Sequence, residues 1–351
     1  MDNKIKIANR IIQCEATIIQ CLKKMDDEKV KLLFVYNKED FVGILTIGDI
    51  QRAIIANVDL NSPISIDNTN KVYATPNEAI EQIKEKMLQI RSECMPVVDN
   101  EGNLVNVFFW EELFENSQSI ILPEKINIPV VIMAGGKGTR LKPLTNVIPK
   151  PLLPIGDKTI LEIILDKFTQ AGCSEFYMSV NYKSDLLKYY LENIPQKYNI
   201  SYFEENEPLG TIGSVSLLKG RITTPFFVSN CDILIEQDLA EIYKYHIENE
   251  NDITIITAIK TYQIPYGVIK SVENGIISEL TEKPDLSYMI NTGVYILQPN
   301  MIDEIPVGQF FHITHLIDKI RAKGGKVGCF PISENSWTDI GEWNEYLKLI
   351  K

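Results

Sequence analysis

The sequence has little histidine, no closely spaced cysteine pair and no long apolar run. Three histidines in 351 residues are too few for a histidine-built metal site. The six cysteines form no Cys-x-x-Cys pair, so we interpret them as reduced, mostly buried thiols of a cytoplasmic protein. No apolar stretch approaches the length of a membrane span, and residues 1–6 lack the apolar segment of a signal peptide. The sequence therefore predicts no membrane association.

Positive charge is also scarce. The formal net charge is −12, so a nucleic-acid partner is not expected. The hydrophobic fraction of 45% is ample for packed cores, and the length predicts about two domains. His312 and His315 share a face if residues 312–323 form a helix. Because no third potential metal ligand is nearby, we expect these two histidines to pack in the core or to line a pocket rather than to bind a metal.

The first third of the chain contains an internal repeat. Leu32–Leu45 aligns with Met95–Phe108 at a constant offset of 63 residues. Each copy is predicted to form a strand, a polar turn, a second strand and a short helix, the helices covering 48–56 and 111–116. An amphipathic helix is predicted before each copy, at about 17–25 and 77–89.

The repeat resembles a pair of CBS domains, a Bateman module. This resemblance implies an adenine nucleotide bound between the repeats. The ribose-binding Thr-x-x-Asp pattern of the family occurs once, as Thr46-Ile47-Gly48-Asp49, which makes Thr46 and Asp49 the predicted ligand residues. The second copy has Phe109, which lacks a hydroxyl, so at most one site is expected. Thr46 and Asp49 also suit a helix N-cap with an acidic first turn, in a module that is structural or forms a dimer interface.

The sequence predicts two domains with a short linker. Residues 1–120 are assigned to the tandem repeats (about 1–60 and 61–120), residues 121–128 to a linker and residues 129–351 to an α/β domain. There, strands are predicted at 130–133, 175–181, 200–204, 225–229, 253–260, 266–271, 291–297 and 326–331. Helices are predicted at 159–171, 184–193, 211–219, 238–248 and 312–323. This alternation predicts a mainly parallel sheet with sites at the carboxyl ends of its strands.

A glycine-rich loop follows the first of these strands. The strand 130–133 leads into Ala134, Gly135, Gly136, Gly138 and Thr139, where backbone N–H groups are able to crowd against a phosphate. Arg140 comes next, and Lys150 stands downstream between two prolines. The pattern lacks the Gly-Lys-Ser/Thr of Walker A and the third glycine of the dinucleotide fingerprint. Its prolines also exclude a regular helix just after the loop. A nucleoside triphosphate is therefore the predicted substrate.

Residues 130–351 resemble the sugar-1-phosphate nucleotidyltransferases, which implies a Rossmann-like domain with a mixed, mainly parallel sheet. In that family a sugar-1-phosphate attacks the α-phosphorus of a nucleoside triphosphate and pyrophosphate leaves. The attacking oxygen is already an anion, so the reaction needs alignment and charge neutralisation rather than a side-chain nucleophile. The resemblance makes Arg140, Lys150 and Asp232 catalytic: Arg140 contacts the β- and γ-phosphates and Lys150 the α-phosphate.

Two aspartates are predicted to hold Mg²⁺. Asp232 follows the strand 225–229, and Asp339 stands in Trp337-Thr338-Asp339-Ile340-Gly341, which is similar to the family's Trp-x-Asp-x-Gly. Carboxylates suit magnesium bound to phosphates. Where the family usually has Gly-Asp, this chain has Cys231-Asp232, which leaves less room in the turn. Either aspartate alone is also compatible with a cap or turn.

The same resemblance assigns the substrate contacts. The predicted nucleotide-binding residues are Ala134, Gly135, Gly136, Gly138, Thr139, Glu204, Pro208, Gly210 and Thr211. The predicted sugar-phosphate-binding residues are Tyr266, Gly267, Glu282, Lys283, Asn291 and Thr292. A plain turn with a helix cap explains the 204–211 segment equally well, and Glu282 with Lys283 also suits a surface ion pair.

The order of domains and the Pro208-Leu209-Gly210-Thr211 segment are most similar to the glucosamine-1-phosphate guanylyltransferases of bacterial legionaminic-acid biosynthesis. This implies GTP and glucosamine-1-phosphate as reactants, Mg²⁺ as cofactor and GDP-glucosamine for surface or flagellin glycans as product. The CBS pair implies a homo-oligomer of two or more chains. Mannose-1-phosphate guanylyltransferase, or another pair of nucleoside triphosphate and hexose-1-phosphate, is the alternative. A hypothesis from another functional class is that the protein is a regulatory adenine-nucleotide sensor whose transferase domain is inactive.

Overall fold

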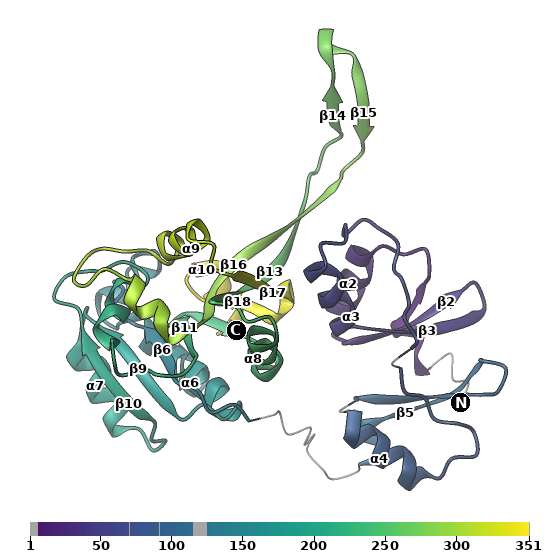
Figure 1. The fold of residues 1–351 in the computed structure, drawn as a ribbon, viewed down its shortest axis with the longest axis horizontal. Helices are drawn as coiled ribbons and strands as arrows, with labels where there is room; N and C mark the ends of the chain where they lie inside the picture. Colours follow the sequence, from purple (N-terminus) through teal and green to yellow (C-terminus); the bar gives the residue numbers. More distant parts are fainter. Residues whose placement is uncertain (1–5, 70, 91, 115–124, 351) are drawn as a thin grey trace. The chain divides into compact units, whose positions relative to one another are not determined.

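The structure is a computed structural model that describes residues 6–69, 71–90, 92–114 and 125–350 (Figure 1). The chain divides into two compact units, Met1–Leu122 and Pro123–Lys351. The predicted linker 121–128 lies partly outside the described residues, as do residues 115 and 116 of the predicted helix 111–116. Among the described helices, none combines the length and apolar character needed to cross a lipid bilayer.

The first unit repeats its strand pairing as its sequence predicts. Strand β1 (Ile11–Gln13) runs parallel to β2 (Leu32–Asn37), which pairs with β3 (Asp40–Thr46); β4 (Cys94–Val98) pairs with β5 (Leu104–Phe109). Ile11 lies opposite Phe34, and Ala74 lies opposite Val97 in an isolated parallel bridge. Ala74 follows Ile11 by 63 residues, and Val97 follows Phe34 by the same number. The two copies of the repeat therefore share this parallel pairing as well as their sequence pattern. The helices are α2 (Ile18–Asp27), α3 (Ile47–Ile55), α4 (Ile80–Ile90) and α5 (Trp110–Leu113).

The second unit is built on a seven-stranded sheet in the order β10-β9-β6-β11-β16-β13-β17. All neighbours are parallel except those that involve β16, which runs antiparallel to both β11 and β13. The predicted mixed, mainly parallel sheet is confirmed. Its strands are β6 (Val130–Met133), β9 (Glu175–Val180), β10 (Asn199–Glu204), β11 (Phe226–Asn230), β13 (Ile253–Gln263), β16 (Asp285–Leu297) and β17 (Val327–Ser333).

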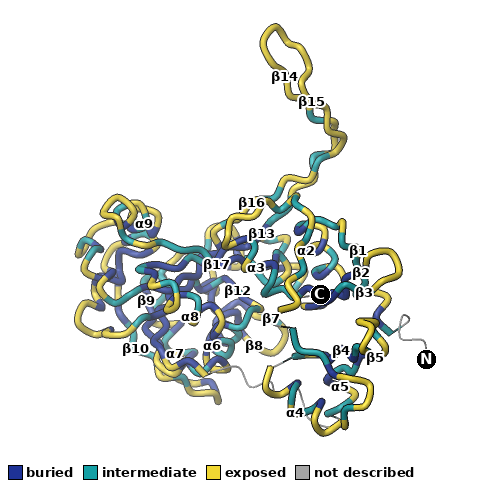
Figure 2. The backbone as a smooth tube through the Cα atoms, turned by 45° about the vertical axis from the view of Figure 1, so that its right-hand side comes forward, coloured by how far each residue is buried: buried dark blue, intermediate teal, exposed yellow. Residues whose placement is uncertain are grey.

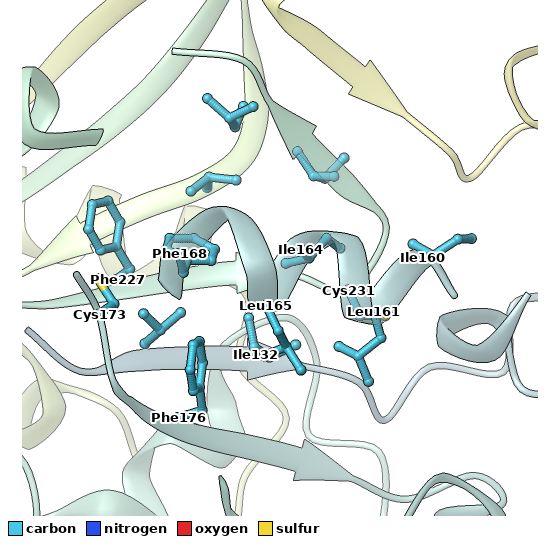
Figure 3. Packing of buried hydrophobic residues seen from close by; sticks show 14 of the residues in the cluster. Ile132, Ile160, Leu161, Ile164, Leu165, Phe168, Cys173, Phe176, Phe227 and Cys231 are labelled. Atoms are coloured by element: carbon cyan, nitrogen blue, oxygen red, sulfur yellow. The ribbon is translucent and has the colours of Figure 1, made fainter. Parts of the chain in front are cut away.

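Helices cover both faces of this sheet. Val130 and Ile132 of β6 face one core, whereas Val131 between them faces the other, as alternation along a strand requires. Figure 3 shows α6 (Ile160–Gln170) against the first face, with the Phe168 and Phe227 ring centroids 5.2 Å apart. The same core includes residues of α7 (Ser184–Asn193), α8 (Leu239–Glu248) and α10 (Trp343–Leu349); the second core includes residues of α9 (Ile313–Ala322).

The predicted α-helix at 211–219 is wrong. The segment forms a short 3₁₀ helix, Gly213–Leu218. The backbone N–H groups of Ile212 and Gly213 both donate to the carbonyl of Phe311, so these groups are used for tertiary pairing rather than for the first turn of an α-helix. Glycine at position 213 permits this close approach of the two segments, because a Cβ there would lie 2.7 Å from the carbonyl oxygen of Gln309.

Short strand pairs complete the unit. Strand β12 (Ile233–Ile235) pairs with β18 (Trp337–Asp339), and β7 (Pro154–Ile155) pairs with β8 (Lys158–Thr159). Strands β13 and β16 continue beyond the sheet as a ribbon that ends in the hairpin β14 (Val268–Ser271) and β15 (Ile277–Thr281) (Figure 1). Most of this ribbon is exposed (Figure 2).

Acidification is expected to destabilise the second unit between about pH 6.5 and pH 4. His246 on α8 is fully buried, with Nδ1 2.8 Å from Thr254 Oγ1, and burial lowers the pKa of its imidazole from 6.5 to about 4. The unfolded chain therefore takes up this proton before the folded chain does. The free energy of unfolding should fall by up to about 3 kcal/mol as the pH drops through this window.

Urea unfolding measured at several pH values checks this expectation. A His246→Gln variant should lose that part of the pH dependence, because glutamine does not titrate. An unchanged slope in the variant would show that His246 is not the cause.

Candidate active site

A hollow of about 310 Å³ opens at the carboxyl end of β11. Because the neighbouring strands β6, β9 and β11 are parallel, the loops that follow them meet at the same edge of the sheet. The hollow is lined by Arg140, Thr211, Asn230, Asp232, Ile233, Asn291, Thr292, Gly293, Tyr295, His312, Ile313, Thr314, Trp337 and Asp339. One cation and both predicted magnesium ligands therefore share one cavity.

The pairing of β12 with β18 brings the two aspartates together. Ile233 lies opposite Asp339, and the N–H of Ile340 donates to the carbonyl of Asp232 at 2.9 Å. A Cβ on Gly341 would lie 2.6 Å from Asp339 Oδ1, 2.9 Å from Lys150 Nζ and 3.4 Å from Asp232 Oδ2. A glycine at this position thus lets three charged side chains crowd around one point of the backbone.

Lys150 is buried, with 7% of its surface exposed, and it forms an ion pair with Asp232. The glycine-rich loop is packed against it. Gly138 has φ +60°, and a Cβ there would lie 2.9 Å from Lys150 Cβ and 2.9 Å from Thr145 Cγ2. The Thr145 hydroxyl also donates to the Gly138 carbonyl at 2.9 Å. The structure therefore brings the loop and Lys150 together, as their predicted joint contact with phosphates requires.

Arg140 is held by a residue that the sequence reasoning missed. Its guanidinium Nη1 lies 2.7 Å from Glu342 Oε1, and both side chains are mostly exposed. The hydrogen bond that Arg140 donates to Glu342, assisted by the charges of Asp339 and Asp232, raises the pKa of Arg140 above its usual value. Glu342 therefore holds the guanidinium at the hollow that Asp232 and Asp339 also line. Since Glu342 follows Gly341 directly, its proximity to the Asp339 motif was the available signal.

The amino end of α9 forms another wall of the hollow, through His312, Ile313 and Thr314. The Ile313 N–H donates to Thr211 Oγ1 at 2.9 Å, so Thr211 binds the start of α9 rather than starting a helix of its own. A helix amino end favours negative charge. His312 lines the pocket, which was one of its two predicted positions.

Other predicted nucleotide residues lie outside the described hollow. Glu204 is exposed and forms an ion pair with Lys188, and Pro208 is exposed. The neighbouring Glu205 is buried instead and accepts a hydrogen bond from the Leu209 N–H at 3.0 Å. Gly210 has φ +83°, and a Cβ there would lie 2.7 Å from the Phe311 carbonyl oxygen. The need for glycine at 210 is therefore explained by contact with the protein's own backbone.

The predicted sugar-phosphate residues divide into two groups. Asn291 and Thr292 line the hollow, at an irregularity in the pairing of β13 with β16. The Asn291 side-chain oxygen accepts from the Gly293 N–H at 3.0 Å and from the Tyr295 hydroxyl at 2.9 Å, which fixes the amide. The remaining residues lie on the ribbon formed by β13 and β16 and its terminal hairpin, outside the hollow: Tyr266, Gly267, Glu282 and Lys283.

Cys231 points into the core beneath the site. It belongs to the same hydrophobic core as the buried residues of α6 (Figure 3), and burial raises the pKa of its thiol to about 12. The thiol is therefore neutral and does not act as a nucleophile. All six cysteines are unpaired and four are buried, which confirms the prediction of mostly buried thiols.

Asp232 and Asp339 are suited to magnesium bound jointly with substrate. Within the described ranges, His, Cys, Asp and Glu side chains do not gather in groups of three or more that could hold a metal ion. Mg²⁺ in nucleotide enzymes commonly takes one or two carboxylates and completes its shell with water and substrate phosphates. Two carboxylates at the edge of a cavity fit that arrangement.

In the first unit, Thr46 and Asp49 cap helix α3. The Asp49 N–H donates to Thr46 Oγ1 at 3.2 Å, and the Thr46 N–H donates to Asp49 Oδ2 at 2.7 Å. Asp49 also forms ion pairs with Arg52 and Lys71. Although burial pushes the pKa of the Asp49 carboxyl up, hydrogen bonds from Lys71 and Thr46 outweigh it and hold that pKa below its usual value. The capping alternative is thus realised, and nucleotide binding at these residues stays a prediction.

Replacing Thr46 by alanine is expected to lower the free energy of unfolding of the first unit by about 1 kcal/mol, because the N-cap hydroxyl is lost. Thermal unfolding measures this change. Titration with AMP or ATP into the wild type and the variant separates a cap from a ligand residue. A cap alone leaves any nucleotide affinity unchanged at temperatures where both proteins are folded.

The second unit therefore brings together groups that suit phosphate transfer: a glycine loop, a buried lysine, an arginine and two carboxylates at the carboxyl edge of a mainly parallel sheet. The chain belongs to the nucleotidyl transferase family, whose model matches residues 129–351. The CBS domain model matches residues 10–56 and 64–117. Both resemblances drawn from the sequence are confirmed at the level of the family.

Individual relatives agree with this assignment. A mannose-1-phosphate guanyltransferase of Pichia angusta is 32% identical over 227 residues, which are 62% of this chain and 62% of the relative. A mannose-1-phosphate guanyltransferase of Yarrowia lipolytica is 32% identical over 225 residues, 62% of this chain and 61% of the relative. The chain thus spans about three fifths of the length of these curated relatives.

One solved structure shows the same fold. A Bacillus anthracis protein, described as a candidate glucose-1-phosphate thymidylyltransferase in complex with sucrose, superimposes with a TM-score of 0.50. The match covers 63% of this chain and 93% of that protein at 20% sequence identity.

Proposed function

We propose that the protein transfers a nucleotidyl group from a nucleoside triphosphate to a sugar-1-phosphate and releases pyrophosphate. The observation that carries this proposal is the meeting of Arg140, Asp232 and Asp339 in one hollow, with Lys150 paired to Asp232 beside it. A site that joins two polyanions needs cations from separate loops and carboxylates for a metal, and the cavity together with the adjoining Lys150 provides both.

The chain's own residues account for the transfer step. A phosphate oxygen of the sugar-1-phosphate attacks the α-phosphorus, and the bond to the bridging oxygen of pyrophosphate breaks. Lys150 donates to the α-phosphate, while Arg140 neutralises the β- and γ-phosphates as negative charge builds on them. Magnesium, when bound at Asp232 and Asp339, supplies further charge neutralisation and holds the phosphates in orientation.

We propose GTP as the nucleotide and glucosamine-1-phosphate as the sugar, which gives GDP-glucosamine for bacterial surface or flagellin glycans on the legionaminic-acid route. The guanyltransferase names of the relatives support the guanine base. The order of a CBS pair followed by a transferase supports the aminosugar. Mannose-1-phosphate is the second candidate, because the same relatives are named for it.

A coupled pyrophosphate assay tests the proposal. GTP, ATP, UTP and dTTP are each combined with the 1-phosphates of glucosamine, mannose, glucose and N-acetylglucosamine in the presence of Mg²⁺. We expect pyrophosphate only when a sugar-1-phosphate is present, with GTP and glucosamine-1-phosphate giving the highest kcat/KM. The highest value with mannose-1-phosphate would select the second candidate. Adenine-nucleotide binding without turnover in any combination would instead support a sensor with an inactive transferase domain.

A further inference from the structure

The ribbon of residues 260–288, here called the arm, leaves the sheet where β13 loses one neighbour. Strand β13 pairs with β17 only as far as Ile259, opposite Ser333. From Lys260 onward it pairs with β16 alone, and the pairing runs without a break to Gln263 opposite Asp285. The arm is therefore a two-stranded extension, in which residues 264–267 and 282–284 connect the stem to the hairpin of β14 and β15 (Figure 1).

One face of the arm is apolar and exposed. Ile269 lies opposite Leu280, and Ser271 lies opposite Ile277, so these side chains share a face. Exposed fractions are 56% for Ile269, 64% for Leu280 and 58% for Ile277. The opposite face has the ion pair between Lys270 and Glu279, 2.7 Å apart. This pattern is that of a strand pair with one face packed and the other in water.

The stem of the arm repeats the pattern. Tyr262 lies opposite Leu286, both exposed, whereas Thr261 and Ser287 share a hydroxyl contact of 2.9 Å on the other face. A two-stranded ribbon is marginally stable in water, and a contiguous exposed apolar surface marks an interface. The exposed apolar side chains of the arm are therefore suited to packing on a protein surface.

The arm also carries one half of the predicted sugar-phosphate site. Gly267 and Glu282 adjoin each other, because a Cβ on Gly267 would lie 2.9 Å from Glu282 Oε2. The other half, Asn291 and Thr292, lines the hollow. Asp285 is six residues along β16 from Asn291, or about 20 Å at ~3.3 Å per residue, and Lys283 is further still. The paired stem, from Lys260 opposite Tyr288 to Gln263 opposite Asp285, therefore holds Lys283 away from the hollow of its own chain.

The charges of the two parts are complementary. At the hollow, Arg140 is paired with Glu342, and beside it Lys150 is paired with Asp232. Asp339 adds a third negative charge near them. A sugar phosphate bound there needs a further cation. Lys283 has positive φ (45°) and makes no salt bridge within the described part of the chain, so its charge is available to a ligand.

We propose that two copies of this chain exchange arms, so that the arm of each copy completes the sugar-1-phosphate site of the other. Tyr266, Gly267, Glu282 and Lys283 of one copy enter the hollow of its partner, and the apolar face of the arm packs against the partner's surface. Exchange of an identical element is a low-cost route to a symmetric dimer. This inference rests on the proposed function, since it assigns residues to the sugar half of the same site.

Complementation between two inactive variants tests the exchange. Lys150→Ala removes a residue of the hollow, and Lys283→Ala removes a residue of the arm. The two chains are co-expressed with different tags, and species that carry both tags are purified. With exchanged arms, each such dimer combines an intact hollow with an intact arm once, so about half of the wild-type turnover is expected. Each homodimeric variant should retain less than about a hundredth, as for loss of a phosphate contact.

Several controls make the result decisive. Asp339→Asn replaces Lys150→Ala if the latter folds poorly, and Lys270→Ala, on the polar face of the arm, should keep both dimer mass and turnover. Ile269→Asp combined with Leu280→Asp should give a monomer by light scattering. A doubly tagged species no more active than its parents, or chains that never co-purify, would overturn the exchange while an active wild type keeps the proposed function. An inactive wild type would instead remove the proposed function, and this inference with it.

Discussion

Replacing Lys150 by alanine is expected to reduce kcat by at least about a hundredfold, equivalent to about 3 kcal/mol of transition-state stabilisation. Lys150 is the buried cation of the site and adjoins the glycine loop through Gly138. It is therefore placed to reach the α-phosphate, whose charge changes during the transfer. Steady-state measurement of pyrophosphate release with saturating substrates gives kcat, and the variant should show this loss without a matching rise in KM.

Removal of Lys150 also leaves Asp232 without its ion-pair partner, and loss of one partner of a buried pair is destabilising. Thermal unfolding must therefore accompany the kinetics, and Lys150→Met, which keeps most of the side-chain volume, separates loss of charge from loss of packing. Lys158→Met is the matched control, because Lys158 is exposed and pairs with Asp166. A Lys150→Met enzyme that is folded and retains near-normal kcat would refute the role of Lys150.

Replacing Asp339 or Asp232 by asparagine is expected to have a comparable effect through the metal. Both carboxylates border the hollow, and asparagine keeps the shape of the side chain but loses its charge. We expect kcat to fall by about a hundredfold or more and the Mg²⁺ concentration for half-maximal rate to rise. Chelation by EDTA should abolish wild-type turnover, and added Mg²⁺ should restore it.

A carboxylate close in sequence but outside the hollow provides the comparison. Glu236 directly follows β12, is exposed and pairs with Lys167. Glu236→Gln should leave both kcat and the magnesium dependence unchanged. Equal magnesium dependence in Asp339→Asn and the wild type would remove Asp339 from the metal site.

Local patterns predicted much of the fold. The β-branched run 130–133 is a buried strand because both its faces are covered, and the prolines after Arg140 limit that segment to short 3₁₀ turns. The offset of 63 residues persists in the parallel pairing of Ala74 with Val97. In these segments short-range preference and tertiary packing agree.

The features that the sequence did not predict depend on tertiary contacts between segments distant in the chain. The 211–219 segment is not an α-helix because its first N–H groups bind the Phe311 carbonyl, which is distant in sequence. Glu342 contacts Arg140, and the amino end of α9 reaches the hollow, only through folding of the C-terminal half. The arm was equally hidden, because its strands alternate like any sheet strand while the sheet around them ends at Ile259.

The fate of the phosphorus atoms tests the central claim most directly. ³¹P NMR follows the enzyme with Mg²⁺, GTP and glucosamine-1-phosphate. We predict that the sugar monophosphate resonance is lost while a diphosphate ester and free pyrophosphate appear in equal amounts, and that neither forms without the sugar phosphate. Release of inorganic phosphate with an unchanged sugar-1-phosphate signal, or no change for any sugar-1-phosphate and nucleotide pair, would contradict nucleotidyl transfer in this hollow.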